Sequence, residues 1–428
     1  MSPTFASLSI YNYRVYAAGA LISNTGTWMA RVAQDWLVLT ELTPHSSVAL
    51  GIVTGLQFAP LALFAPIAGM ITDRFPKRRL LFATQSALAL TSLLTGVLVV
   101  TGAVQLWHIY LLAFAQGVAT ALDNPARQTF VSEMVPHESL SNAVGLGSAS
   151  FNAARLIGPG AAGLVIAAVG TGPAFFVNTL SFVAVLFALS RMRTGELNPA
   201  PRPHGKGQIR EGLRYVRGRP DIMLIMALVF VLGTFGMNFQ MTTALMATVV
   251  FHKGASAYGL LGSIMAVGSL SAALLSARRP HPRLRILLVA LAAFVVASAA
   301  AALAPSYVWF AVLLIPVGLF ALTVLTTANS MVQLSVDPAM RGRVMALYMA
   351  VFMGGTPLGS PLIGWIGSAW GPRWTILVGS VTTGLAVLAA TVYLMRSENI
   401  HVSYHRQRRP RLSVTRGETS EPVPEVAN

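Results

Sequence analysis

Twelve long apolar segments restrict what this sequence can fold into. Of its 428 residues, 54% are hydrophobic and 10% are charged, whereas soluble domains carry about 25% charged residues. Each segment suffices to cross a bilayer, which takes about 20 apolar residues. The segments are residues 14–40, 46–72, 80–101, 106–132, 139–168, 172–192, 221–250, 256–277, 284–304, 307–335, 342–369 and 374–395. We expect an all-α integral membrane protein with twelve transmembrane helices, because a backbone in lipid needs helices or closed barrels, and barrel strands alternate.

Basic residues are concentrated in alternate loops. If both termini lie on one side, the opposite loops carry only Lys253 and Arg373, and three further arginines (Arg31, Arg127 and Arg155) fall inside apolar segments. The positive-inside rule then places both termini in the cytoplasm of a multi-pass protein of the inner membrane. The net charge of +16 is explained by topology and by anionic lipids at the cytoplasmic face, so we expect no nucleic-acid partner.

The chain divides into two related halves. The expected parts are a six-helix bundle over residues 1–192, a cytoplasmic linker with a basic amphipathic helix over 193–220, a second six-helix bundle over 221–396, and a disordered cytoplasmic tail over 397–428. A shift of 202 residues aligns Pro159 with Pro361, and neighbouring positions match at the same spacing. Such pseudo-symmetric halves are a known transporter architecture, with the substrate site between them.

A short basic turn lies between the second and third apolar segments. In order, it contains Gly69, Asp73, Arg74, Lys77 and Arg78. The spacing resembles the signature of the major facilitator superfamily, with Pro76 in place of the usual glycine, and the resemblance covers about residues 10–396. It implies a fold of two six-helix bundles and transport by alternating access.

The resemblance implies that this turn is a gating latch on the cytoplasmic side. Asp73 would cap a helix of the other half, where a carboxylate gains about 0.3–1 kcal/mol, and Arg78 would pair with Asp123 near the end of the fourth segment. Arg127, four residues after Asp123, belongs to the same latch, while we expect Glu133 to be solvated at the interface. The alternative is that these charges only set the topology.

Two further stretches resemble one branch of the superfamily. Residues 123–128 and 152–163, together with residues 33–37, are similar to the transmembrane secretion effectors, a branch that includes the enterobactin exporter. Within them, Gly158, Pro159 and Gly163 resemble a motif that marks exporters in the superfamily. The alternative for these small residues is close helix packing.

Charges inside the membrane are functional candidates because they cost several kcal/mol. Arg31 and Asp35 are four residues apart and share a helix face. Asp35 lies toward the outer end, where it could load a proton, so both are candidates for proton coupling. The alternative is a static ion pair. Arg155 either attracts an anionic substrate or pairs with Asp35.

Polar side chains inside the apolar segments are candidates for lining a substrate cavity. Besides Arg155, these are Asn24, Gln34, Gln57, Gln116, Asn152, Asn238, Gln240, Asn329 and Gln333. For any single amide, hydrogen bonding between helices is the simpler interpretation.

Nothing in the sequence indicates catalysis. It contains no Walker lysine motif and no metal-ligand cluster, so we expect no enzyme activity, cofactor or metal. The sequence predicts a monomeric secondary transporter that exports a small molecule (a drug, siderophore or other metabolite) by proton antiport. The alternatives are a nutrient importer or facilitator of the same fold, and a membrane sensor that does not transport.

Overall fold

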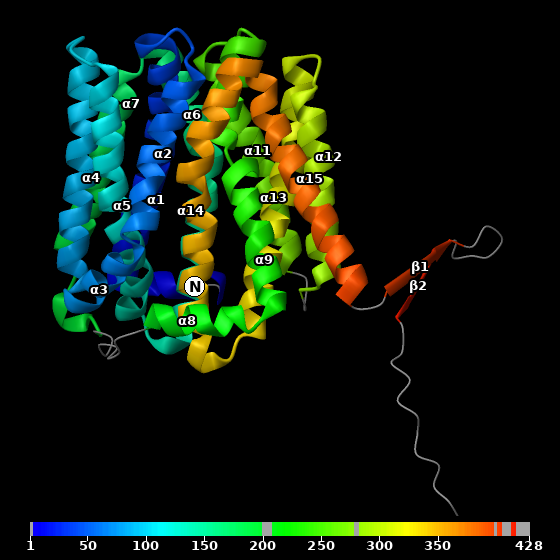
Figure 1. The fold of residues 1–428 in the computed structure, drawn as a ribbon. Helices are drawn as coiled ribbons and strands as arrows, with labels where there is room; N and C mark the ends of the chain where they lie inside the picture. Colours follow the sequence, from blue (N-terminus) through cyan, green and yellow to red (C-terminus); the bar gives the residue numbers. More distant parts are fainter. Residues whose placement is uncertain (1–2, 199–207, 278–281, 398–399, 405–411, 417–428) are drawn as a thin grey trace, which may run out of the picture.

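The computed structural model describes residues 3–198, 208–277, 282–397, 400–404 and 412–416. Apart from two short strands in the tail, the regular structure of these residues is helical (Figure 1). Nine described helices are long and apolar enough to cross a membrane, and Ser47–Leu63 is a shorter apolar helix. The prediction of an all-helical membrane protein is therefore confirmed.

The N-terminal half contains seven α-helices, a short 3-10 helix (η1) and a short π-helix (η2). They are η1 (Pro3–Ser9), α1 (Tyr11–Trp36), η2 (Leu37–Leu42), α2 (Ser47–Leu63), α3 (Ala65–Arg74), α4 (Lys77–Val100), α5 (Leu106–Met134), α6 (His137–Val169) and α7 (Gly172–Arg191). Helix α1 packs on α6 and α7, α4 packs on α5 and α7, and α2 packs on α5. The predicted second segment is thus divided into α2 and α3, which meet at Phe64.

The C-terminal half follows a short turn, η3 (Thr194–Glu196). Its elements are α8 (Gln208–Arg217), α9 (Pro220–Val231), η4 (Leu232–Gly236), α10 (Phe239–Leu245), η5 (Met246–Val250), α11 (Ala255–Ala277), α12 (Leu284–Ala302), α13 (Tyr307–Ser335), α14 (Pro338–Trp370) and α15 (Pro372–Ser397). Helix α13 packs on α11 and α12, and α15 packs on α12 and α14. The apolar segment 220–250 is broken between η4 and α10 at Met237 and Asn238.

Helices α6 and α14 share several local features. Each is 33 residues long, contains internal proline and ends at a glycine with positive φ, 84° at Gly170 and 93° at Gly371. A left-handed glycine is a common helix stop because it has no Cβ to clash there. The two ends are 201 residues apart, which agrees with the internal repeat expected from the sequence.

One end of the bundle carries the basic turn and is called the basic end below. The turn between α3 and α4 lies there, and α8 runs across the same end (Figure 1). Gly212 of α8 faces Arg343 of α14, Glu211 forms an ion pair with Arg343, and Val216 is buried. Helix α8 therefore packs on the start of α14, in addition to the membrane-surface position expected for it.

The tail contains two antiparallel strands, β1 (Ile400–Tyr404) and β2 (Leu412–Arg416), where the sequence predicts disorder. They lie beyond α15 and outside the helical bundle (Figure 1). The other tail residues, 398–399, 405–411 and 417–428, and the linker residues 199–207 lie outside the described part of the chain. The prediction of disorder for those positions stays a prediction.

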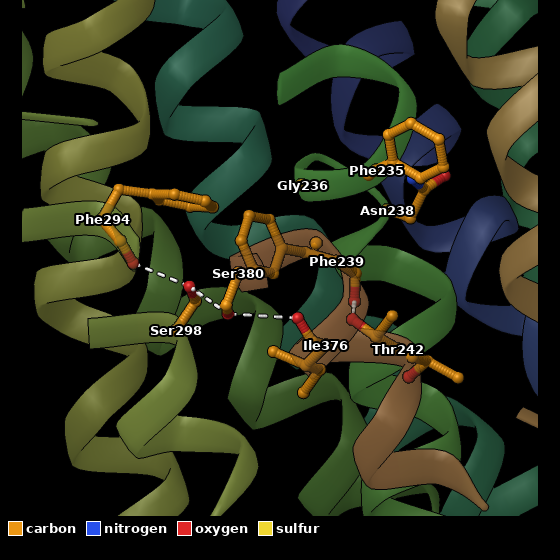
Figure 2. A pocket seen from close by; sticks show the side chains of 11 residues that line it. Phe235, Gly236, Asn238, Phe239, Thr242, Phe294, Ser298, Ile376 and Ser380 are labelled. Atoms are coloured by element: carbon orange, nitrogen blue, oxygen red, sulfur yellow. Dashed lines mark hydrogen bonds between the residues drawn. The ribbon is translucent and has the colours of Figure 1, made fainter. Parts of the chain in front are cut away.

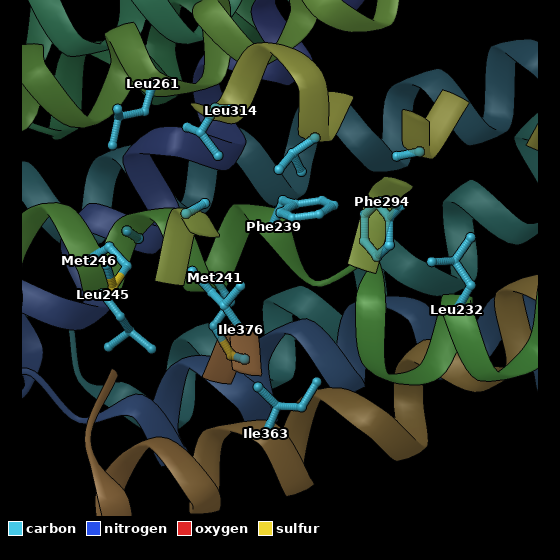
Figure 3. Packing of buried hydrophobic residues seen from close by; sticks show 14 of the residues in the cluster. Leu232, Phe239, Met241, Leu245, Met246, Leu261, Phe294, Leu314, Ile363 and Ile376 are labelled. Carbon is cyan, nitrogen blue, oxygen red and sulfur yellow. The ribbon is translucent and has the colours of Figure 1, made fainter. Parts of the chain in front are cut away.

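The largest buried cluster surrounds the broken segment of the C-terminal half. Figure 3 shows Phe239 of α10 beside Phe294 of α12, with Leu232 and Ile376 nearby. The two rings meet edge to face with their centroids 5.9 Å apart, a favoured aromatic geometry. Tight packing at this point holds α9, α10, α12 and α15 together despite the break in the helix.

Truncation of Phe294 should destabilise the C-terminal half. Phe294 is fully buried, so Phe294→Ala should lower the free energy of unfolding by about 3–5 kcal/mol through lost contacts and a new cavity. The melting temperature in detergent measures this loss. Val296→Ala is the matched control, since Val296 lies in the same helix and is 69% exposed. Equal melting of both variants would contradict the assigned packing.

Candidate functional site at the contact between the halves

Among the described helices, the two most extensive contacts between the halves are those of α2 with α14 and of α6 with α11. Glycine allows the backbones to approach closely in both pairs. A Cβ on Gly51 of α2 would lie 2.5 Å from the carbonyl oxygen of Ser360 in α14. A Cβ on Gly163 of α6 would lie 2.7 Å from the carbonyl oxygen of Ala255 in α11. The Ser47 hydroxyl also donates to the Gly364 carbonyl at 2.7 Å. These contacts leave no room for a side chain at the glycines.

The stretch that resembles the export motif lies at the second of these contacts. The Ser263 hydroxyl of α11 donates to the Leu156 carbonyl at 2.5 Å and accepts from the Gly160 amide at 3.1 Å. Gly262 of α11 faces the Pro159 ring, and Gly158 faces Trp28 of α1. Pro159 and Gly163 therefore pack against the other half, while Gly158 brings α6 close to α1.

The close glycine contacts described above lie toward the end of the bundle away from the basic turn. Four glycines nearer the basic end have open space where a Cβ would project: Gly69 of α3, Gly145 and Gly147 of α6, and Gly342 of α14. Helix α2 packs on α14, but its continuation α3 packs on α5 instead, and Met70 of α3 is 65% exposed. The halves thus meet at one end and part at the basic end.

A buried carboxylate bridges the halves at the closed end. The Tyr258 hydroxyl of α11 donates to Asp35 Oδ2 of α1 at 2.8 Å, and both residues are almost fully buried. The Tyr258 ring stacks on Trp36, with the centroids 6.4 Å apart, and the Gln240 side chain also reaches the carboxylate. Asp35 therefore has partners from two elements of the opposite half.

The expected ion pairs of Asp35 are absent. No basic nitrogen of the described residues lies within 4.0 Å of its carboxylate oxygens, so neither Arg31 nor Arg155 pairs with it. Sequence spacing identified the partner on the same helix, whereas the structure supplies a neutral phenol 223 positions away. A tyrosine inside the eighth apolar segment was the available signal, and its hydroxyl needs a partner when it is buried.

The two arginines lie against aromatic rings. The Arg31 guanidinium is 5.2 Å from the Trp28 ring and 5.7 Å from the Phe58 ring, and the Arg155 guanidinium is 5.7 Å from the same Trp28. These distances fall within the range of cation–π attraction. Trp28, Arg31 and Arg155 therefore form one cluster between α1 and α6, with Phe58 contributed by α2.

The basic turn makes a different ion pair from the predicted one. Lys77 Nζ lies 3.4 Å from Glu133 Oε1, and Glu133 is buried instead of solvated as the sequence suggested. Arg78 donates from Nε to the Leu189 carbonyl at 2.9 Å and lies over the Phe82 ring. The acid beside the turn is thus Glu133, and it pairs with Lys77 inside the N-terminal half.

Asp123 belongs to a separate buried network and is not paired with Arg78. It accepts hydrogen bonds from Thr84 and Gln85 of α4, both at 2.7 Å, and pairs with Arg127 at 2.6 Å. Three of its lone-pair sites are therefore occupied, which compensates for burial. This network joins α4 to α5.

Of the remaining turn residues, Gly69 and Arg74 lie in the last turns of α3, and capping by Asp73 stays a prediction.

The predicted cavity amides do not converge on one site. Gln57 donates to Gln116 at 2.8 Å, which links α2 to α5. Asn238 donates to the Thr234 carbonyl at 2.8 Å and accepts from Ser360 at 2.7 Å, so it fastens the broken segment to α14. In these cases the simpler interpretation, hydrogen bonding between helices, describes the contacts.

The other amides are scattered over the bundle. Two of them form hydrogen bonds: Asn24 accepts one from Arg127 at 3.5 Å, and Asn152 donates one to the Ser148 carbonyl. Gln34 lines a small hollow, and Gln240 lies near Asp35. Asn329 is half-buried, and Gln333 is exposed. Only Gln240 joins the polar contact between the halves.

Two small hollows lie within the halves. Figure 2 shows one in the C-terminal half, where Ser298 and Ser380 share a hydrogen bond of 2.8 Å beside Phe239 and Phe294. A similar hollow beside Gln34 lies in the N-terminal half, and each has room for about one water molecule. Because each hollow is lined by a single half, neither is a site between the halves.

Comparison with known proteins agrees with this architecture. The profile of the family described as transmembrane secretion effector matches residues 2–423. The chain therefore belongs to this family of the major facilitator superfamily, as the motifs indicated. It is a family of transporters, and the expectation that the chain is no enzyme is confirmed by this membership.

Similar proteins are known by sequence and by structure. The chain is 27% identical to the multidrug efflux pump Tap of Mycolicibacterium fortuitum over 90% of this chain and 96% of that protein. It is 32% identical to the staphyloferrin A transporter of Staphylococcus aureus, but over 38% of this chain and only 41% of that protein. A bacterial Spinster homologue in an inward-facing, unoccupied conformation superposes with a TM-score of 0.67 at 17% identity, covering 92% of this chain and 98% of that one.

A side chain at Gly163 should open the contact between α6 and α11. In Gly163→Val, the new Cβ would press on the Ala255 carbonyl, so the ends of the two helices away from the basic turn should separate. The chain has no cysteine, so spin labels on cysteines placed at Val169 and Lys253 can report the distance. Gly147→Val is the control, because that position has open space. An unchanged distance distribution in folded Gly163→Val would refute the assigned closure.

Proposed function

We propose that the protein is a secondary transporter that exports a small molecule across the cytoplasmic membrane by alternating access. The observation that carries this proposal is the one-sided contact of α2 with α14 and of α6 with α11. The basic end is cytoplasmic under the positive-inside rule. The chain is then in an inward-facing state, closed on the outside and open to the cytoplasm.

The proposed topology has twelve spans in two six-helix bundles, with both termini in the cytoplasm. Nine spans are the long apolar helices, and α1, α2 with α3, and α5 complete the set. Helices α1 and α5 have the length of a span, 26 and 29 residues, but carry more charged and amide side chains. Such polar positions are expected on helices that face the interior of a bundle.

Export is the direction best supported. The relative that matches over nearly its full length is named a multidrug efflux pump, and another is named macrolide efflux protein A. The stretch resembling the export motif, Gly158 to Gly163, also lies at a contact that must open and close during transport. We infer that the substrate is a drug, siderophore or other metabolite.

Asp35 is the proposed site of proton coupling. Its carboxylate is hydrogen-bonded by Tyr258 across the closed end, so opening of that end would separate the two groups and expose the carboxylate to the outside. Arg31, one helical turn nearer the basic end, is close enough to interact electrostatically with Asp35. Protonation from outside would accompany return to the inward-facing state, which gives antiport.

The basic turn is the proposed latch of the opposite state. In an outward-facing protein, α3 would close on the C-terminal half, and Asp73 would cap a helix of that half. Lys77, Arg78, Asp123 and Arg127 would support that closure from within the N-terminal half, as their present contacts with α5 and α7 do. The arginines of the turn also suit anionic lipids, and we infer a monomer.

The proposal is tested by transport in everted membrane vesicles. Vesicles containing the protein should accumulate at least one member of a panel of cationic, neutral and anionic fluorescent compounds when a proton gradient is applied. Collapse of the gradient with an ionophore should abolish the accumulation. Uptake by intact cells, or accumulation that ignores the gradient, would contradict export or coupling respectively.

Replacement of Asp35 should separate coupling from movement of substrate. Asp35→Asn keeps the acceptor for Tyr258 but cannot bind and release a proton, so gradient-driven accumulation should fall to background. Exchange of labelled for unlabelled substrate without a gradient should continue. Glu196→Gln, which alters an exposed carboxylate, is the control. Full gradient-driven transport by Asp35→Asn would remove Asp35 from the mechanism.

A further inference from the structure

The cluster of Arg31, Arg155 and Trp28 contains more positive charge than its surroundings balance. Neither guanidinium lies within 4.0 Å of a carboxylate oxygen of the described residues. The Nε of Arg31 is buried and has no hydrogen-bond partner in the described part of the chain. The two arginines also interact with each other, which for like charges is repulsion.

The two arginines are half-buried, and aromatic contacts alone do not compensate for the hydration that their charges lose. A cation–π contact contributes about 0.5–2 kcal/mol, whereas desolvation of an unpaired charge costs several kcal/mol for each ion. Asp35 lies one turn from Arg31 and attracts it electrostatically, but the carboxylate accepts its hydrogen bonds from Tyr258 and Gln240 of the other half. A bound anion would supply the missing charge and accept the free donors.

The cluster lies where the two halves begin to part. On α6, Arg155 directly precedes Leu156, whose carbonyl receives the hydrogen bond from Ser263. On α1, Arg31 lies one turn nearer the basic end than Asp35, which contacts Tyr258. The two arginines therefore lie next to the close contacts between the halves, on the side of those contacts that faces the basic end.

Helix α2 shows the same transition. Gly55 packs on Pro357 and Pro361 of α14, and Phe58 follows one turn nearer the basic end, over Arg31. Phe151 of α6 meets Trp28 edge to face and is 48% exposed. The arginines are thus surrounded by aromatic rings, one of which borders the accessible side.

We propose that Arg31 and Arg155 bind the anionic group of the transported molecule and that Trp28, Phe58 and Phe151 contact its aromatic or apolar body. Guanidinium groups bind carboxylates through two parallel hydrogen bonds, and two of them can hold one anion from different helices. The chemical class is an aromatic carboxylate. The transport role rests on the proposed function, whereas the binding does not.

Binding of matched naphthalene compounds to the purified full-length chain tests the proposal. Equilibrium dialysis in detergent compares naphthoate with neutral naphthamide and cationic naphthylmethylamine, which share the ring and differ in charge. Naphthoate should bind most tightly. Arg31→Gln and Arg155→Gln should each weaken its binding about tenfold or more, as expected for the loss of a charge-assisted hydrogen bond, without a comparable effect on naphthamide.

Conservative and remote variants keep the test decisive if a glutamine variant fails to fold. Arg31→Lys and Arg155→Lys retain the charge but lose the planar fork, so they should bind naphthoate with intermediate affinity. Arg285→Gln removes an exposed charge elsewhere and should bind as the unaltered chain does. Equal binding of the three compounds, or wild-type naphthoate affinity in the folded arginine variants, would overturn the proposal.

The dialysis result is independent of transport direction and coupling. Selective naphthoate binding without efflux in vesicles would contradict the proposed exporter and leave the site intact. Gradient-driven efflux of the panel compounds, together with naphthoate binding that ignores both arginines, would contradict the site and leave the exporter intact.

Discussion

The close approach of backbones at glycine is the interaction on which the structure depends. In lipid there is no hydrophobic force between apolar helices, so association relies on packing and polar contacts. Gly51 against Ser360 and Gly163 against Ala255 provide that packing between the halves. Because the same helices lose these contacts toward the basic end, a single geometric feature determines both the cohesion of the two halves and the side on which they open.

The sequence predicted the helices well because apolar length is a local property. Segments 80–101, 172–192 and 307–335 agree with α4, α7 and α13 within a few residues. Partners of buried charges could not be predicted in the same way. Spacing finds neighbours on one helix, whereas Tyr258 reaches Asp35 only after two distant helices pack. Glu133 was expected in water for a similar reason, since its burial depends on the position of Lys77 at the start of α4.

The halves share a backbone plan but differ in chemistry. In the described spans, the N-terminal half buries Asp35, Asp123 and Glu133, whereas the C-terminal half relies on hydroxyl and amide groups such as Asn238 and Ser298. The C-terminal half thus holds its shape through neutral hydrogen bonds and aromatic packing. The buried carboxylates of the described spans are therefore concentrated in the N-terminal half, and Tyr258 of the C-terminal half donates a hydrogen bond to one of them, Asp35.

The placement of α8 has a mechanical consequence. Through Glu211 it is joined to Arg343 near the start of α14, while the tight contact of α14 with α2 lies near Ser360. These points are 17 residues apart, or about 25 Å along a helix. If α14 pivots at the glycine contact, a tilt of about 10° displaces the end beside α8 by about 4 Å. A force on α8 would then be transmitted along α14 to its contact with α2.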